Sequence, residues 1–178
     1  MAHAHVSGLT IAVITEGEIA WSGAFGVRST ATREPVDENT MFEAASLSQP
    51  VTAYIILRLV DQGIMDLDTP LADYLPYPRL AGNERYRQLT ARIVLTHTTG
   101  LPNWGAGFIR DPGVKFGYSG EGFLYLGRVA EKLTGLSLQD LAKREVFEPL
   151  GMGHTSYVWN DAYAANDACG HDRHGQDH

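Results

Sequence analysis

The segment from Ser46 to Gln62 is apolar on nearly every helical face, and this restricts the fold more than any other feature of the sequence. Val51, Ile55 and Leu59 repeat at the spacing of one face, and further aliphatic residues fill the other faces. A helix of this kind must be buried on several sides, so the rest of the chain has to pack around it. Gly63 suits the position just beyond its end, where a left-handed backbone is common.

Two strands are predicted before this helix and several shorter helices after it. β-Branched and apolar residues over 9–15 and 18–23, separated by Glu16-Gly17, predict a hairpin. Helical patterns follow over residues 70–74, 90–96, 120–134 and 137–147, and residues 24–41 are predicted to form a loop in which a short strand stays open. Because strands and helices do not alternate, the predicted class is α+β, with a helical portion packed on an antiparallel sheet.

Capping residues mark several of the predicted helix ends. The run Asp68-Thr69-Pro70 predicts a cap followed by proline at the first helical position, and Thr90 predicts an N-cap. Ser137 and Asp140 resemble a capping box, and Gly135 is predicted to end the helix over 120–134.

Length and charge set the broad class. The chain has 178 residues, which corresponds to one domain at about 150 residues per domain. We therefore predict a single domain over residues 1–178, with flexible tails at 1–7 and 170–178. Acidic residues (21) outnumber basic ones (14), so no nucleic-acid partner is expected, because such domains need clustered positive charge.

The sequence also bears on the compartment. No apolar run approaches the roughly 20 residues that span a bilayer, so no membrane partner is expected. The N-terminus lacks the lysine or arginine of a signal peptide, which predicts a cytoplasmic protein, or a periplasmic or secreted one if a leader has been removed. The single cysteine, Cys169, cannot form an internal disulfide, which is compatible with a reducing compartment.

Ser46 is the first residue that suggests chemistry. It lies at the first turn of the apolar helix, where free backbone N–H groups and the helix dipole stabilise negative charge on an oxygen atom. Serine at a helix start is also a common N-cap, and position alone leaves both roles open.

Two later segments, His97-Thr98-Thr99-Gly100-Leu101 and Tyr118-Ser119-Gly120, add to this serine. In order and spacing, the set resembles the serine β-lactamase and penicillin-binding-protein superfamily. The most similar branch is the class C β-lactamase-like one, with its D-alanyl-D-alanine carboxypeptidases and family VIII-type esterases. The resemblance covers about residues 8–172 and implies a hydrolase that needs no cofactor and acts on a small-molecule ester or β-lactam.

By this resemblance, Ser46 is the acylated nucleophile of the family's Ser-x-x-Lys motif. The lysine of that motif lies one turn further along the same helix face, where it can take the proton of the serine. Here Gln49 occupies the lysine position, and an amide cannot act as a general base. The activity is therefore predicted to be weakened.

Tyr118 matches the tyrosine of the family's Tyr-x-Asn motif and is predicted to be the catalytic base. Ser119 fills the middle position, and Gly120 stands where an asparagine amide would contact the acyl group of the substrate. Esterase-like members also carry Tyr-Ser-Gly, so the sequence favours esters over β-lactams. Without the resemblance, Tyr118 would be interpreted as a buried tyrosine with a satisfied hydroxyl.

Other polar residues near these motifs are not predicted to catalyse. Lys115 is interpreted as a solvated surface lysine, although an approach to Tyr118 from its loop stays open, and His97 is interpreted as a capping or core residue. No Gly-x-Ser-x-Gly elbow supports a Ser-His-Asp triad. No metal site is predicted, because the C-terminal histidines have irregular spacing, as in a flexible polar terminus: His171, His174 and His178.

A later sheet strand carrying Lys/His-x-Gly completes the active site in the family, and this sequence contains no such strand. The predicted domain is thus β-lactamase-like but incomplete, with the C-terminal sheet strands missing. Two strands alone form a marginal sheet whose apolar side is partly uncovered. A homo-oligomer or a strand-exchanged assembly is expected to cover it.

Two functions follow from these observations. The first is a serine hydrolase that acts on esters or β-lactam and amide acyl donors through an acyl-enzyme on Ser46. The alternative is a catalytically inactive, truncated relative that binds a ligand or a partner.

Overall fold

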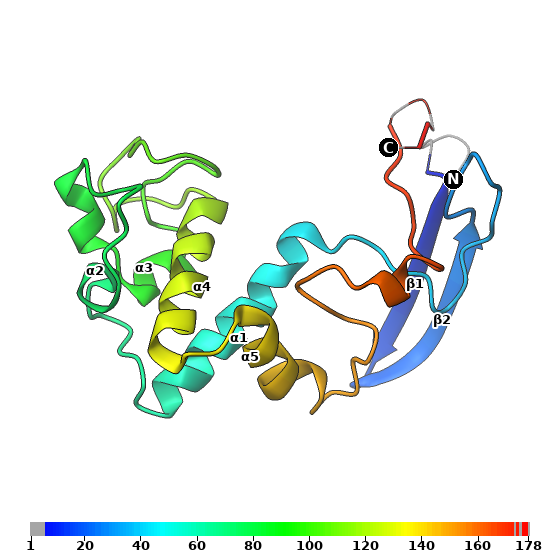
Figure 1. Ribbon diagram of the computed structural model, residues 1–178, viewed down its shortest axis with the longest axis horizontal. Coiled ribbons are helices and arrows are strands. Elements are labelled where there is room, and N and C mark those ends of the chain that lie inside the picture. Colours follow the sequence, from blue (N-terminus) through cyan, green and yellow to red (C-terminus); the bar gives the residue numbers. More distant parts are fainter. Residues whose placement is uncertain (1–5, 173, 175, 178) are drawn as a thin grey trace. The chain divides into compact units, whose positions relative to one another are not determined.

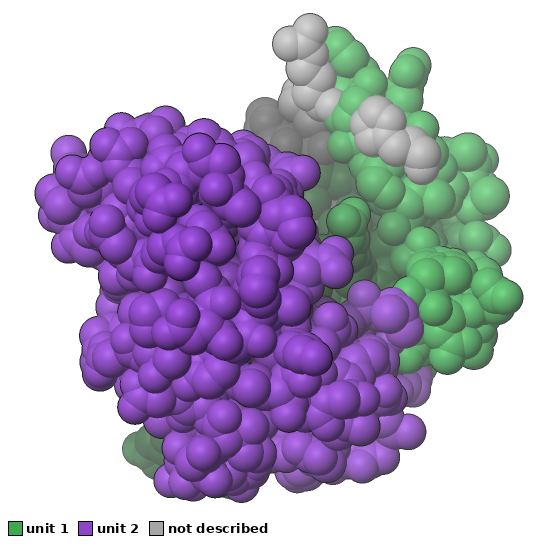
Figure 2. Space-filling model, turned by 60° about the vertical axis from the view of Figure 1, so that its left-hand side comes forward, with its two compact units in different colours: residues 1–44, 159–178 green, residues 45–158 purple. Residues whose placement is uncertain are grey.

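The structure, a computed structural model, describes residues 6–172, 174 and 176–177, and it divides into two compact units. Unit 1 comprises residues 1–44 and 159–178, and unit 2 comprises residues 45–158 (Figure 2). In the described part of the chain, no helix is long and apolar enough to cross a membrane.

Unit 1 is built on an antiparallel hairpin of β1 (Gly8–Thr15) and β2 (Glu18–Gly26), which confirms the predicted pair of strands (Figure 1). Glu16 and Gly17 connect the strands with φ angles of 54° and 82°, both in the left-handed region that a two-residue hairpin turn requires. Leu9 pairs with Phe25, and the register shifts between Val13 and Ile14.

The strands leave much apolar surface in contact with solvent. Ile14, Ile19 and Trp21 are exposed, and within the described residues the sheet contains two strands. These side chains form the uncovered apolar surface that a two-stranded sheet was expected to have.

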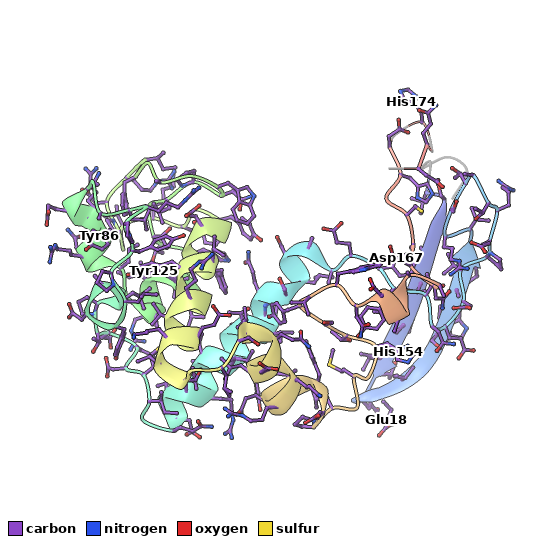
Figure 3. All side chains as sticks on the ribbon, in the orientation of Figure 1. Glu18, Tyr86, Tyr125, His154, Asp167 and His174 are labelled. Atoms are coloured by element: carbon purple, nitrogen blue, oxygen red, sulfur yellow. The ribbon has the colours of Figure 1, made fainter. Side chains whose placement is uncertain are left out.

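The C-terminal segment of unit 1 is tied to the loop that follows β2. Arg28 donates to the carbonyl of Ala165 and to Oδ1 of Asn166, and Met41 forms a bridge with Asp167, which is labelled in Figure 3. The predicted tails lie partly outside the described residues. Within them, Asp177 accepts hydrogen bonds from the residues at positions 29 and 30, and these bonds hold the pKa of its carboxyl far below the usual range.

Unit 2 is helical. Its longest helices are α1 (Ser48–Asp61) and α4 (Gly120–Thr134), which pack against each other and against α5 (Leu138–Ala142). The short helices α2 (Leu71–Tyr74) and α3 (Ala91–Leu95) also pack on α4 (Figure 1). The most deeply buried aliphatic residues come from all of these helices and include Ile55, Ile56, Leu59, Leu71, Val94, Leu126 and Leu141.

Most predicted helix ends are confirmed. The hydroxyl of Thr90 accepts from the Ile93 N–H at the start of α3, and Gly135 ends α4 with a φ of 70°. One prediction is wrong: Pro70 is not the first helical residue but the N-cap of α2, with a ψ of 129°, and the helix has no side-chain cap. The helix predicted over 137–147 is also divided, since α5 continues as a π-helical turn, η4 (Lys143–Phe147).

Aromatic residues fill the side of α4 that faces α2. The hydroxyl of Tyr125 donates to the carbonyl of Leu75 at 2.7 Å, and its ring stacks on Tyr77 with centroids 4.5 Å apart. Tyr86 lies on the same side of α4 (Figure 3). Burial raises the pKa of Tyr125, and its hydrogen bond and ring stacking give it a structural role.

Candidate active site

Ser46 lies in the 3-10 turn η2 (Ala45–Leu47), directly before α1. The preceding residue, Ala45, has a φ of 43°, a left-handed conformation that costs a non-glycine residue about 1–2 kcal/mol. The hydroxyl of Ser48 donates to the Ala45 carbonyl at 2.7 Å and stabilises this turn. A strained residue beside a candidate nucleophile is typical of functional sites.

Ser46 is exposed, and its side chain makes no hydrogen bond with any residue that the structure describes. The N-cap of α1 is Leu47, and no side chain caps the helix. The interpretation of Ser46 as a helix cap is therefore wrong, and its hydroxyl is available for chemistry.

Gln49 and Tyr118 meet, although 69 residues separate them in the sequence. Nε2 of Gln49 donates to the hydroxyl oxygen of Tyr118 at 2.7 Å. Gln49 belongs to the first turn of α1, one turn after Ser46, so the bond joins the serine segment to the loop that carries Tyr118. The residue in the lysine position and the predicted base are thus direct neighbours.

His97 supports Tyr118 from the other side. The two rings stack with centroids 4.7 Å apart and planes inclined by 26°. Nδ1 of His97 accepts the Ser119 N–H at 3.2 Å, and the His97 carbonyl accepts the Gly117 N–H at 2.8 Å. Burial lowers the pKa of His97, which favours the neutral ring that can accept at Nδ1. His97 thus holds the loop in place, in keeping with the structural role expected for it.

The hydroxyl of Ser119 acts within the fold both as a hydrogen-bond donor and as an acceptor. It is buried, donates to the Pro102 carbonyl at 2.9 Å and accepts the Gly122 N–H at 3.2 Å as the N-cap of α4. The structure thus gives Ser119 the role of fixing Tyr118 and Gly120 on either side of it.

The loop over residues 102–105 is attached to the start of α4 by Asn103. Its Oδ1 accepts the Gly120 N–H at 2.9 Å, and its carbonyl accepts the Glu121 N–H at 2.8 Å. Gly105 N–H in turn donates to the Glu121 carboxylate at 3.2 Å. Trp104 lies between these anchors, on the exposed side of the loop.

Glu121 is a fully buried carboxylate in the first turn of α4. Arg79 donates to it through Nε at 2.7 Å, and the arginine side chain is itself half exposed. Sequence reasoning did not single out this pair or Asn103. The available signal was the acidic residue two positions after a polar cap in a helix expected to be buried, because such a charge needs a partner.

The cation that contacts the Tyr118 loop is Arg110. It donates to the Phe116 carbonyl at 3.0 Å, and an arginine cannot accept a proton from substrate or serine. Lys115 is exposed and forms no ion pair or hydrogen bond within the described residues, as a solvated surface lysine would.

Over the same residues, no group of three or more His, Cys, Asp or Glu side chains is arranged to hold a metal ion.

Known proteins are similar to this chain in both sequence and architecture. A family model described as "Beta-lactamase" matches residues 1–178. Esterase EstB from Burkholderia gladioli is 33% identical over 186 residues, which cover 85% of this chain and 47% of the esterase. The chain spans between 37% and 49% of the length of this esterase and of two curated penicillin-binding proteins that it also matches.

Two solved structures superpose on the whole chain. One is a class C beta-lactamase, with a TM-score of 0.88 and 25% identity, of which this chain covers 53%. The other is the octameric penicillin-binding protein homologue from Pyrococcus abyssi, with a TM-score of 0.85 and 25% identity, of which it covers 47%. The predicted α+β architecture is therefore confirmed.

Proposed function

Because this chain belongs to the beta-lactamase family, as its motifs indicated, we propose that it is a serine hydrolase that forms an acyl-enzyme on Ser46. Esters are the proposed preferred substrates, with β-lactam and amide acyl donors as further ones. The family and the names of the relatives, esterase and beta-lactamase, support an acyl-transfer enzyme. The observation that carries the proposal is the 2.7 Å bond between Gln49 and Tyr118, which brings the serine segment and the tyrosine loop together.

In the proposed reaction Tyr118 acts as the phenolate: Oγ of Ser46 attacks the carbonyl carbon of the ester as its proton passes to the phenolate oxygen of Tyr118. The tetrahedral oxyanion is stabilised by unpaired backbone N–H groups at the start of the helix. As the intermediate collapses, the carbonyl–alkoxide bond breaks and the leaving oxygen takes the proton from Tyr118. Water then attacks the acyl-enzyme, gives its proton to the tyrosine oxygen and releases the acid, and the proton returns to Ser46.

Gln49 fixes the position of Tyr118 in this scheme but adds no charge. A hydrogen bond donated to the tyrosine oxygen stabilises negative charge on it, and an amide does so less than the ammonium of a lysine. General-base catalysis contributes about 10²–10⁴ to the rate. We therefore propose slow turnover compared with relatives that carry the lysine.

A second candidate is a binding protein without turnover. The observation that favours it is the amide of Gln49 itself, since neither of its polar atoms can take the Ser46 proton at neutral pH. Such a protein would bind an acyl compound or a partner beside Tyr118 without cleaving it.

Hydrolysis of a chromogenic short-chain ester separates the two candidates. We expect measurable turnover by the protein, none by Ser46→Ala, and a loss of at least tenfold in Tyr118→Phe. Tyr54→Phe is the matched control, because Tyr54 is 49% exposed, close to the 40% of Tyr118, and lies on the same helix as Gln49. Equal turnover by the protein and by Ser46→Ala would contradict the proposal. A protein without turnover that still binds the ester would support the second candidate.

A further inference from the structure

Gly120 and Trp104 compete for the same space. A Cβ atom on Gly120 would lie 2.9 Å from Oδ1 of Asn103 and 3.0 and 3.1 Å from Cη2 and Cζ2 of the Trp104 indole. A contact under 3.0 Å requires one of the atoms to shift, and the Gly120 backbone does not have a positive φ. Glycine is therefore favoured here for space, because the Asn103 amide and the Trp104 indole together occupy the place of a Cβ atom.

The loop that carries Trp104 is anchored on both sides of it, although most of the residue's surface is exposed. Its side chain is 66% exposed, yet Asn103 before it and Gly105 after it are both hydrogen-bonded to the start of α4. A large aromatic surface kept exposed on an anchored loop loses little conformational entropy on contact with a ligand, because its position is already set.

The indole is connected to the proposed reaction centre through Gly120. Gly120, which it contacts, is two residues from Tyr118, and Tyr118 is bonded to Gln49 one turn after Ser46. By the resemblance described above, position 120 is where the family places an asparagine amide against the acyl group. Here a flat apolar ring takes the place of that polar contact.

We propose that Trp104 is a specificity-determining residue that packs against the acyl group of the substrate and selects aromatic acyl esters, such as arylacetyl esters. This inference rests on the proposed function, since it names the acyl group that the Ser46 site accepts. Aromatic rings gain from stacking on an indole beyond their buried area, whereas a small acyl group such as acetyl cannot cover it.

The first test compares p-nitrophenyl phenylacetate with p-nitrophenyl acetate. Trp104→Ala is expected to lower the ratio of kcat/KM for the two esters by about fivefold to tenfold, and Trp104→Phe should keep most of it. Gly120→Ala should also lower the ratio, because the added methyl displaces the Asn103 amide and the Trp104 indole that lie 2.9–3.1 Å from it. Leu150→Ala, which removes an apolar side chain that is 70% exposed, is the control and should leave the ratio unchanged.

The second test measures binding without turnover. In the Ser46→Ala background, phenylacetate should bind more tightly than acetate in NMR titrations, and Trp104→Ala should remove the difference. If ester turnover is absent but this difference depends on Trp104, the proposed function fails and the inference stands. If turnover needs Ser46 but neither the kcat/KM ratio nor binding depends on Trp104, the inference alone is overturned. A preference for acyl groups that carry an amide would also overturn it, since Asn103 would then make the contact.

Discussion

Two substitutions of His97, His97→Asn and His97→Phe, should rank in opposite order for stability and for activity. The ring of His97 supports Tyr118, and its Nδ1 satisfies the N–H of buried Ser119. Its backbone has a φ of 53°, a conformation that asparagine tolerates and most residues do not. His97→Asn therefore keeps an acceptor and fits the backbone but removes the ring, whereas His97→Phe keeps the ring and removes the acceptor.

The magnitudes follow from these contacts. Loss of the stacked ring in His97→Asn should lower the free energy of unfolding by about 1 kcal/mol, within the range of aromatic pairs. His97→Phe leaves a buried N–H without a partner, which costs about 1–3 kcal/mol, so it should be the less stable variant. Activity should depend on the ring, because the ring supports Tyr118. We expect kcat for a short-chain ester to fall about tenfold in His97→Asn and by less in His97→Phe.

Urea unfolding at pH 7.5 and steady-state ester hydrolysis measure the two effects. The reasoning is refuted if His97→Phe is the more stable variant, or if His97→Asn retains full kcat.

The same residue predicts a dependence on pH. Because burial lowers the pKa of His97 in the folded protein, the unfolded chain binds more protons as pH falls below about 6.5, the ordinary histidine value. The stability contributed by His97 is thus present above pH 6.5 and is lost as pH falls through the folded pKa. His97→Asn should reduce the loss of stability between pH 7 and pH 5, and an unchanged pH profile would argue against a neutral His97.

Three further predictions concern Gln49, Glu121 and the sheet. Gln49→Lys should raise ester turnover at least tenfold, and no gain would show that the missing lysine does not limit the rate. Arg79→Ala should lower the free energy of unfolding by about 2 kcal/mol, more than Glu121→Gln, because it leaves a buried carboxylate without its cation, and the reverse order in urea titrations would contradict this. We also expect self-association, because the strand residues leave apolar surface exposed, and Ile19→Glu should shift the population towards the monomer; a monodisperse monomer that binds no hydrophobic dye would rule this out.

Local patterns in the sequence were enough to predict most of the secondary structure. The hairpin turn at Glu16-Gly17, the cap at Thr90 and the end of α4 at Gly135 each depend on a few neighbouring residues, and each is confirmed. Pro70 shows the limit of such patterns. The N-cap and the first helical position are only one residue apart, and the sequence pattern did not distinguish them. No comparable local signal in the sequence marks the point after α5 where the helix changes to the π-helical turn η4.

The site was predictable only where a family motif marks it. Ser46, Gln49 and Tyr118 carry such motifs, but their contact across 69 residues depends on how the helices of unit 2 pack. Asn103, Trp104 and Arg79 act through long-range contacts to the start of α4, and no short pattern in the sequence announces them.

Labelling by a fluorophosphonate tests the central claim, that Ser46 is a nucleophile, most directly. We expect one adduct in the intact mass, located on Ser46 and not on Ser48 by peptide fragmentation, and none in Ser46→Ala or in heat-unfolded protein. Folded protein that stays unlabelled at high reagent concentration, or a Ser46→Ala variant that labels as the unmodified protein does, would contradict the account.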